Sequence, residues 1–448
     1  MRIIISGAGD VGFHVAKLLA NEGHDITVID KNAGRLDYVS AHLDVATLRG
    51  SSSSPVILRE AGVSKADLLL SVTFSEDTNI ATALIAKQMG AKKILARVDS
   101  DEFLETVEGF NLSGEGIDEI IIPELLAARE IAHLLKQSAA THTFDFGGGA
   151  LVLLGVSVDT RSNLLGSMLN RIAKEYQVDS FTNVAILRGN KTIIPSGDTT
   201  FELNDHAYFI CTPEGVKEIM RLSKKPPLHV KNVAILGGGK LGVYTARCLC
   251  LSDDYNIKLI EKDKDRCYEL ADQFPDLFMI NGDGRDAELL SEEGVEEMDA
   301  FIAVTGDSET NIISCLLAKR RGVVRDIALV ENIDYIHLSQ SIGVETMINK
   351  KLIAANSIFR YVRKGEVVSL TSLYGVDAEV LEFQVPENSK ILRGKVQDLN
   401  FPKDAVLGGV IRNEKGYAIR GDFTFFPGDH VVVLCRAGSI REVEKFFR

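Results

Sequence analysis

The chain has 448 residues, of which 45% are hydrophobic and 25% are charged, and its formal net charge at pH 7 is −13. This composition is typical of a globular protein, and the length exceeds what one hydrophobic core usually serves. The acidic balance argues against nucleic acid and against an anionic membrane surface as the main target. Neither a signal peptide nor an apolar run of the ~18 residues that a membrane span needs is evident, so a cytoplasmic protein is expected.

The N-terminal part alternates between short apolar segments and helical patterns. Strands are expected over 3–7, 25–30, 45–48, 67–73, 93–98 and 118–122. Helices are expected over 11–22, 32–41, 55–61, 77–89, 101–108 and 124–137. This alternation predicts an α/β fold with a doubly wound (Rossmann) parallel sheet.

A glycine motif, Gly-x-Gly-x-x-Gly, joins the first expected strand to the first expected helix. Gly7 permits the tight turn, Gly9 lets the backbone approach a pyrophosphate, and Gly12 lets the helix pack against the strand. The helix N-terminus then offers N–H groups and a positive dipole to phosphates. Glycine-rich turns also occur without a ligand. The predicted nucleotide-binding loop comprises Gly7, Ala8, Gly9, Asp10, Val11 and Gly12.

Two charged residues at strand ends extend the predicted site. Asp30 ends the second strand about 20 residues beyond the glycines, where an acid hydrogen-bonds a ribose. A carboxylate there favours NAD, ADP or ATP over NADP, because it repels a 2′-phosphate. The alternative is a solvated strand-end acid. Arg97 ends the fifth strand, at the edge where open α/β sheets bind ligands.

Several weaker candidates surround the same edge of the sheet. Thr73 closes the fourth strand and is placed to bond ribose or pyrophosphate, although an ordinary strand-end threonine is the alternative. Gly50 and the serines at 51–54 are expected near the adenine, although a serine run is usually a loop. Asn79 is expected to serve hydrogen bonding at a helix start. Two further candidates are Lys31 and Phe74.

A different pattern follows the first sheet. Residues 138–149, which end in three glycines, are predicted to be a domain junction. Strands over 150–158, 183–190, 191–197 and 206–212, with helices near 164–174 and 213–222, predict a small α+β domain. The Lys-Lys-Pro-Pro segment at 224–227 is interpreted as a short, stiff linker.

The whole order then repeats in the second half. Gly7, Gly9 and Gly12 correspond to Gly237, Gly239 and Gly242. The small domain repeats as well, with Arg188, Gly197, Asp198, Asp205 and His206 corresponding to Arg412, Gly421, Asp422, Asp429 and His430. Identities in register across two fold types indicate a duplication. The predicted domains are 1–137 (Rossmann), 143–225 (small), 230–364 (Rossmann) and 368–448 (small).

The second copy predicts a second, unequal nucleotide site. Glu261 stands in the place of Asp30, but Leu329 replaces Arg97. Lys240 is placed to supply the missing cation, with a solvent-facing lysine as the alternative. The expected residues of this site are Gly237, Gly238, Gly239, Lys240, Leu241, Gly242, Glu261, Gly282, Asp283 and Thr305.

Residues that bind metals show no convincing pattern. The six cysteines lack CxxC or zinc spacing and are interpreted as buried small hydrophobes. The nine histidines form no HxxxH or HExxH, so no dedicated transition-metal site is expected. Four aspartates of the small domains lie in turn sequences, and a divalent-ion site is the alternative to turn chemistry there: Asp198, Asp205, Asp422 and Asp429.

With these motifs in place, the chain resembles the TrkA family, the peripheral nucleotide-binding subunits of Trk potassium-uptake systems, which contain two RCK (KTN) halves. The resemblance covers essentially the whole chain. It rests on GAGDVG, REAGVSKADLLLSVT with EDTNI, and IIPSGDTTFELNDHAYFI in the first half. In the second half it rests on GGGKLG, EEGVEEMDAFIAVT, ETNI and AIRGDFTFFPGDHVVVL.

The resemblance implies a regulatory subunit without catalytic residues. Such subunits bind NAD, NADH, ATP or ADP, with an arginine at the position of Arg97 on the phosphates. The resemblance further implies a ring, expected to be a homotetramer, at the inner face of the membrane beneath a TrkH- or TrkG-type potassium-translocating subunit. Two alternatives are an NAD-dependent dehydrogenase with tandem cofactor domains and the soluble sensor of another channel type.

Overall fold

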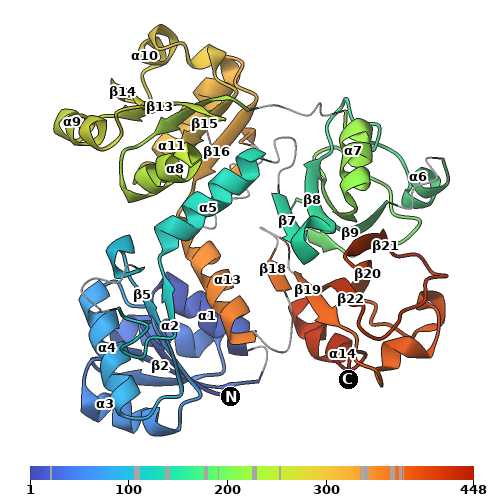
Figure 1. The fold of residues 1–448 in the computed structure, drawn as a ribbon, viewed down its shortest axis with the longest axis horizontal. Coiled ribbons are helices and arrows are strands. Elements are labelled where there is room, and N and C mark those ends of the chain that lie inside the picture. Colours follow the sequence, from blue (N-terminus) through green and yellow to red (C-terminus); the bar gives the residue numbers. More distant parts are fainter. Residues whose placement is uncertain are drawn as a thin grey trace. The chain divides into compact units, whose positions relative to one another are not determined.

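A computed structural model describes residues 1–20, 23–104, 111–136, 142–175, 180–189, 191–224, 230–251, 254–332, 335, 342–344, 346–363, 369–372, 376 and 378–448. These residues form two six-stranded parallel sheets and two five-stranded antiparallel sheets (Figure 1). By its contacts the chain divides into two compact units. The first contains Met1–Ala128 and Asn349–Val362, and the second contains Arg129–Ile348 and Arg363–Arg448.

The first parallel sheet has the strand order β3-β2-β1-β4-β5-β6. The order reverses between β1 and β4, and ligands of open α/β sheets bind at the carboxyl ends of strands at such a point. The predicted doubly wound topology is therefore confirmed. The strands are β1 (Arg2–Ser6), β2 (Asp25–Asp30), β3 (Ala46–Arg49), β4 (Leu68–Ser71), β5 (Lys93–Arg97) and β6 (Glu119–Ile121).

The helices of this half are α1 (Asp10–Ala20), α2 (Ala33–His42), α3 (Pro55–Glu60), α4 (Glu76–Gln88) and α5 (Pro123–Lys136). Helix α1 buries Val11, Val15 and Leu19. The helix expected over 101–108 is wrong where it is described, because Asp101–Leu104 form a short 3-10 helix. Residues 105–108 lie outside the described part of the chain.

The second parallel sheet repeats the same order as β14-β13-β12-β15-β16-β17, which confirms the duplication. Its strands are β12 (Asn232–Leu236), β13 (Asn256–Glu261), β14 (Phe278–Asn281), β15 (Ala300–Ala303), β16 (Arg325–Leu329) and β17 (Thr346–Ile348). Its helices include α8 (Lys240–Cys250), α9 (Lys264–Gln273), α10 (Ala287–Glu292) and α11 (Ser308–Arg320).

The first antiparallel sheet has the order β10-β9-β11-β8-β7. Its elements are β7 (His142–Phe146), β8 (Leu151–Ser157), β9 (Phe181–Arg188), β10 (Lys191–Ile193), β11 (His206–Cys211), α6 (Leu169–Glu175) and α7 (Pro213–Leu222). Within the predicted junction over 138–149, residues 142–146 form an edge strand that pairs with β8 and was not predicted. Most of the expected linker, residues 225–227, lies outside the described chain.

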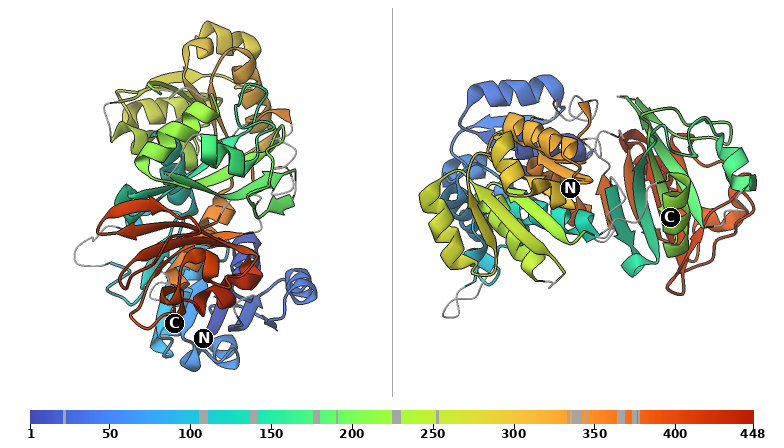
Figure 2. Two further views of the ribbon diagram at one scale, coloured as in Figure 1. Left: turned by 90° about the vertical axis from the view of Figure 1, so that its right-hand side faces the viewer. Right: turned by 90° about the horizontal axis from the view of Figure 1, so that it is seen from above.

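The second antiparallel sheet mirrors the first, with the order β18-β19-β22-β20-β21. Its elements are β18 (Ser369–Ser372), β19 (Glu379–Gln384), β20 (Ala405–Arg412), β21 (Lys415–Ala418), β22 (His430–Cys435) and α14 (Ile440–Glu444). The two small sheets lie face to face (Figure 2). Leu153 and Tyr208 of one sheet share a buried cluster with Val380 and Val432 of the other.

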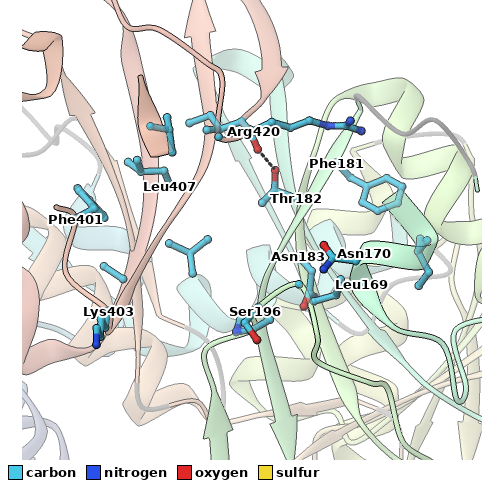
Figure 3. A pocket seen from close by; sticks show the side chains of 18 of the residues that line it. Leu169, Asn170, Phe181, Thr182, Asn183, Ser196, Phe401, Lys403, Leu407 and Arg420 are labelled. Atoms are coloured by element: carbon cyan, nitrogen blue, oxygen red, sulfur yellow. Dashed lines mark hydrogen bonds between the residues drawn. The ribbon is translucent and has the colours of Figure 1, made fainter. Parts of the chain in front are cut away.

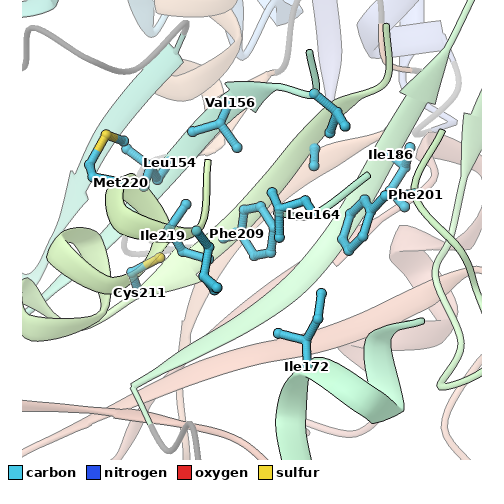
Figure 4. Close-up of a cluster of buried hydrophobic side chains, with 13 residues drawn as sticks. Leu154, Val156, Leu164, Ile172, Ile186, Phe201, Phe209, Cys211, Ile219 and Met220 are labelled. Atoms are coloured by element: carbon cyan, nitrogen blue, oxygen red, sulfur yellow. The ribbon is translucent and has the colours of Figure 1, made fainter. Parts of the chain in front are cut away.

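Each small sheet also needs a core on its other face. In the first small domain, the apolar face of α7 packs Ile219 against Phe209 of β11, and Phe201 and Ile172 extend the cluster (Figure 4). Burial of large apolar side chains in this way supplies most of the stability of such a small domain. The first small domain is therefore held by one cluster of its own and one that it shares.

Cysteine burial differs from the prediction at two positions. Cys211, Cys267, Cys315 and Cys435 are buried, as expected, whereas Cys250 is exposed and Cys248 is half-buried. Burial raises the pKa of the Cys211 and Cys315 thiols well above the usual value, so both stay protonated and behave as small apolar groups. Among the described residues, no helix combines the length and the apolar character that crossing a membrane requires.

Candidate nucleotide-binding sites

The glycine loop of the first half has the backbone geometry that only glycines allow. Gly7 has φ +108°, in the region that L side chains rarely adopt, and its N–H donates to the Ile29 carbonyl at 2.8 Å. A Cβ atom on Gly12 would lie 1.9 Å from the Gly7 carbonyl oxygen. The atom that excludes a side chain at position 12 therefore belongs to the loop itself, not to the neighbouring strand.

The second loop has nearly the same geometry. Gly237 has φ +108° and donates to the Ile260 carbonyl at 2.8 Å. A Cβ atom on Gly242 would lie 1.9 Å from the Gly237 carbonyl oxygen. Both loops turn from a strand into the N-terminus of a helix, α1 or α8, whose first N–H groups have no partner within the helix. Each half therefore contains a strand–loop–helix unit suited to an anion.

The surroundings of the central glycine differ between the two loops. A Cβ atom on Gly9 would lie 3.0 Å from Cε2 of Phe74, so the phenyl ring covers this part of the first loop. Among the described residues, apart from the chain neighbours and the backbone of α8, no atom lies within 4 Å of the corresponding position on Gly239. The residue that corresponds to Phe74 is Gly306, which has no side chain to cover the second loop.

The two strand-end acids bond to their own glycine loops. The Asp30 carboxylate accepts the Ala8 N–H at 2.7 Å and the Asn32 N–H at 2.8 Å. In the second half, Glu261 accepts the Gly238 N–H at 2.6 Å. These acids hold the loops in place, and each carboxylate oxygen still has a further lone pair for a ligand hydroxyl.

A buried asparagine connects the ends of two strands in each half. Asn79 is 1% exposed, accepts from the N–H and the hydroxyl of Thr73 at 2.8 and 2.7 Å, and donates to the Arg97 carbonyl at 3.0 Å. Asn311 makes the same bonds to Thr305 and to the Leu329 carbonyl. The prediction that Asn79 serves the start of its helix is therefore wrong. Its side chain fixes the spacing of β4 and β5 where a ligand would lie.

Two arginines flank the Phe74 ring in the first half. The guanidinium carbon of Arg35 lies 5.1 Å from the ring centroid, and that of Arg97 lies 6.0 Å from it. Arg97 also reaches Asp99, with Nη2 3.2 Å from Oδ1. Sequence reasoning missed Arg35, although Arg266 occupies the corresponding position of the second half and could have revealed it.

The second site holds its cations differently. Arg285 Nε donates to Asp283 Oδ1 at 3.0 Å, and Arg285 Nη2 donates to Asp283 Oδ2 at 2.7 Å. Lys262 Nζ lies 3.2 Å from Asp283 Oδ2. The hydrogen bonds from Arg285 hold the pKa of Asp283 below its usual range. Arg266 donates to the Gly238 carbonyl at 3.2 Å. Leu329, in the place of Arg97, is buried. Asp283 is thus engaged by two cations, Arg285 and Lys262, neither of which was predicted.

Packing accounts for some of the other predicted residues. A Cβ atom on Gly50 would lie 2.6 Å from Ile57, and one on Gly282 would lie 2.2 Å from Leu289. Both glycines therefore allow a helix to approach. The first-turn residues Val11 and Leu241 are buried, whereas Lys31 is exposed.

The small-domain aspartates are of two kinds. Asp205 is fully buried and pairs with Arg188, while Asp429 pairs with Arg412 through two contacts of 2.7 Å. These bonds raise the pKa of both arginines, so the pairs stay charged. Asp422, in contrast, is exposed. Within the described ranges, no group of three or more His, Cys, Asp or Glu side chains is arranged to hold a metal ion.

A cavity of about 1190 Å³ lies between the two small domains (Figure 3). Its charged lining includes Lys403 and Arg420, and Phe181 lies on the facing wall. The Thr182 hydroxyl donates across the interface to the Ile419 carbonyl at 3.4 Å. No local sequence pattern indicates this cavity, because its walls come from two separate domains.

Comparison with known proteins supports the same organisation. The TrkA-N domain model matches residues 3–123 and 233–350, and the TrkA-C domain model matches residues 153–224 and 380–448. The chain is 31% identical to Trk system potassium uptake protein TrkA homolog 1 of Methanosarcina mazei, with 100% of both chains covered. It is 32% identical to Trk system potassium uptake protein TrkA of Haemophilus influenzae, with 100% of this chain and 99% of that one covered.

Solved structures share the fold at lower identity. The GsuK RCK domain matches with a TM-score of 0.58 and 14% identity, covering 100% of this chain and 95% of that one. The GsuK channel bound to NAD matches with the same TM-score and identity, covering 100% of this chain and 78% of that one. Since two domain models match in tandem and the relatives align over their full length, the chain belongs to the TrkA family.

Proposed function

We propose that the chain is the cytoplasmic regulatory subunit of a Trk-type potassium transport system and that its two Rossmann halves bind adenine nucleotides. The observation that carries this proposal is the pair of glycine loops, each formed around a positive-φ glycine and each followed by a helix N-terminus. Its relatives are named Trk system potassium uptake proteins, and GsuK channel structures are described as bound to NAD and to ADP.

In the first site, the glycine loop would hold the phosphates and Asp30 would accept a ribose hydroxyl. Arg97 stands at the carboxyl end of β5, where its guanidinium can bond two phosphate oxygens. In the second site, Lys240 begins α8 and Glu261 takes the ribose. Because Leu329 replaces Arg97, the two sites should differ in affinity or in preferred ligand.

Regulation requires more than binding. A nucleotide shifts an equilibrium only by its differential affinity for the two states, so ATP and ADP, or NADH and NAD, must prefer different conformations of the assembly. The assembly would be a ring, a homotetramer, attached at the inner face of the membrane to a TrkH- or TrkG-type subunit. The nucleotide acts there as a signal, and no reaction is carried out on it.

Native mass spectrometry with added ADP, ATP, NAD and NADH tests the proposal directly. We expect an oligomer with bound nucleotide, and Arg97→Ala should weaken the first site by roughly tenfold or more, as expected for a lost charged hydrogen bond. Lys240→Ala should spare the first site and weaken the second. A monomer without bound nucleotide would contradict the proposal. Turnover of NADH with small keto acids would support a dehydrogenase instead.

The Phe74 ring should slow nucleotide entry to the first site. A pyrophosphate that approaches Gly9 must displace the ring, and the ring then loses its contacts with Arg35 and Arg97, which are worth about 0.5–1 kcal/mol each when exposed. Phe74→Gly copies the second half at this position. We expect it to raise the association rate constant at least severalfold, measured by stopped flow with a fluorescent ADP. Tyr38→Ala, on the exposed side of α2, is the control variant. Alanine is used there because a glycine would disrupt the helix.

A further inference from the structure

One helix of the second half belongs to the compact unit of the first Rossmann sheet. Helix α13 (Lys350–Arg363) follows the second sheet in sequence, but its residues up to Val362 belong to the compact unit of the first sheet, where α13 lies beside α1 (Figure 1). Two adjacent lysines form its first turn. The second half of the chain thus brings two ammonium groups to the first half.

These two lysines contact different elements. Lys351 Nζ lies 2.7 Å from Oδ2 of Asp10, and Lys350 Nζ lies 3.1 Å from Oε1 of Glu124. Glu124 is in the first turn of α5, whereas Asp10 is the first residue of α1 and lies inside the glycine loop. The side chains of Lys351 and Lys350 are similarly exposed, at 23% and 24%. Lys351 therefore reaches the predicted phosphate-binding loop.

Asp10 is an unfavourable neighbour for a phosphate. Its carboxylate occupies the positive end of α1, which is also the position that a phosphate would take, and like charges repel there. The second loop has Lys240 at this position, so the repulsion is specific to the first half. A cation beside Asp10 removes the repulsion and can itself bond a phosphate oxygen.

The other titratable group beside this pair does not supply the charge. His14 lies one turn further along α1, and burial lowers its pKa, with Lys17 and Lys351 acting in the same direction and Asp10 opposing them. The imidazole is therefore neutral at pH 7. Lys351 and Lys17 are the cations that act on it, and Lys17 is exposed near the C-terminal end of α1.

We propose that Lys351 is a phosphate-binding residue of the first nucleotide site, and that a bound phosphate replaces Asp10 as its partner. This inference rests on the proposed nucleotide function. The change of partner ties the first turn of α13 to the occupancy of the first site. In sequence, α13 precedes β18 of the second small domain.

Calorimetric titration of the full-length protein with ADP tests this role. The part of the ADP-binding signal that is lost in the Asp30→Ala variant is assigned to the first site. We expect Lys351→Met to weaken that component about tenfold, while Lys350→Met, the matched neighbour, changes it less than twofold. Lys351 has two possible roles, to neutralise Asp10 and to bond a phosphate oxygen. Asp10→Asn separates them, because it removes the repulsion from Asp10 but leaves the phosphate contact of Lys351. Adding Lys351→Met to Asp10→Asn should therefore still weaken binding about tenfold.

Three results would overturn the inference. If Lys351→Met binds ADP as the wild type does while Arg97→Ala still weakens binding, this inference fails and the proposed function stands. If the Asp10→Asn/Lys351→Met variant binds as tightly as Asp10→Asn, the lysine only neutralises Asp10. If the ADP titration of Asp30→Ala matches that of the wild type, both the proposed function and this inference fail. Hydrogen exchange of residues 349–362 should change on ADP addition in the wild type and not in Lys351→Met.

Discussion

Gly12→Ala is expected to abolish nucleotide binding at the first site and to destabilise the first Rossmann sheet by about 3 kcal/mol. The new Cβ atom would lie 1.9 Å from the Gly7 carbonyl oxygen, and a backbone atom cannot yield as a side chain can. The loop must open, which moves the N–H groups of α1 away from the phosphate position. Titration with ADP and hydrogen exchange of the buried strand residues Ile3–Ile5 measure the two effects.

A second glycine supplies the control for this prediction. Gly34 is an exposed residue of α2, and the nearest atom to its Cβ position lies 3.4 Å away, on the Asn32 side chain. Gly34→Ala should leave binding intact and add up to about 1 kcal/mol of helix stability. If Gly12→Ala bound ADP as well as Gly34→Ala does, the loop would not be the phosphate site. Gly242→Ala, with the same 1.9 Å approach, applies this test to the second half.

Local patterns explain why so much of the fold could be predicted. The strands of both Rossmann halves are short apolar runs, the helices between them are amphipathic, and the glycine positions follow from backbone conformation, so each is visible within a few residues. The duplication strengthened these predictions, because the strands of all four sheets and most of the helices appear twice. Even the difference at Arg97 and Leu329 follows from aligning one half on the other.

What the sequence did not reveal depends on contacts between distant segments. The pairing of Lys351 with Asp10 joins residues from the two halves, and nothing in either local pattern indicates that α13 belongs to the compact unit of the first sheet. The cation–π contacts of Phe74 with Arg35 need the turn after β4 to approach α2. Strand β7 was missed because its short alternating run is followed at once by three glycines, which favour a loop.

Side-chain partners were also missed where a turn sequence gave a sufficient explanation by itself. Asp429 and Asp205 stand in good turn sequences, and each does accept an N–H within its turn, from Phe426 and Glu202 respectively. The larger contact is with an arginine seventeen residues earlier, Arg412 or Arg188, across the sheet. Both members of the pair recur in register, because Arg188 and Asp205 correspond to Arg412 and Asp429. This repeat is the sequence feature that indicates the pairing.

Asp429→Ala is accordingly expected to cost the second small domain about 3–5 kcal/mol of stability. The change leaves Arg412 without its two-point partner and the Phe426 N–H without its acceptor, in a place where Asp429 is 2% exposed. Arg412 would keep its position over the Phe426 ring, 4.4 Å from the centroid, and its bond to the Thr424 carbonyl, which limits the loss.

Asp422, an exposed aspartate near the same turn, provides the control that distinguishes the Arg412–Asp429 pair from local turn hydrogen bonds. Asp422→Ala should change stability by less than about 0.5 kcal/mol, because the side chain is exposed. Since the chain has no tryptophan, urea unfolding followed by circular dichroism, with hydrogen exchange of Val431–Val433 to localise the effect, is the suitable measurement. Equal effects of the two substitutions would show that the buried pair does not hold the turn. Because the small sheets share a core, a loss confined to Asp429→Ala should also increase exchange in β11 of the first small domain.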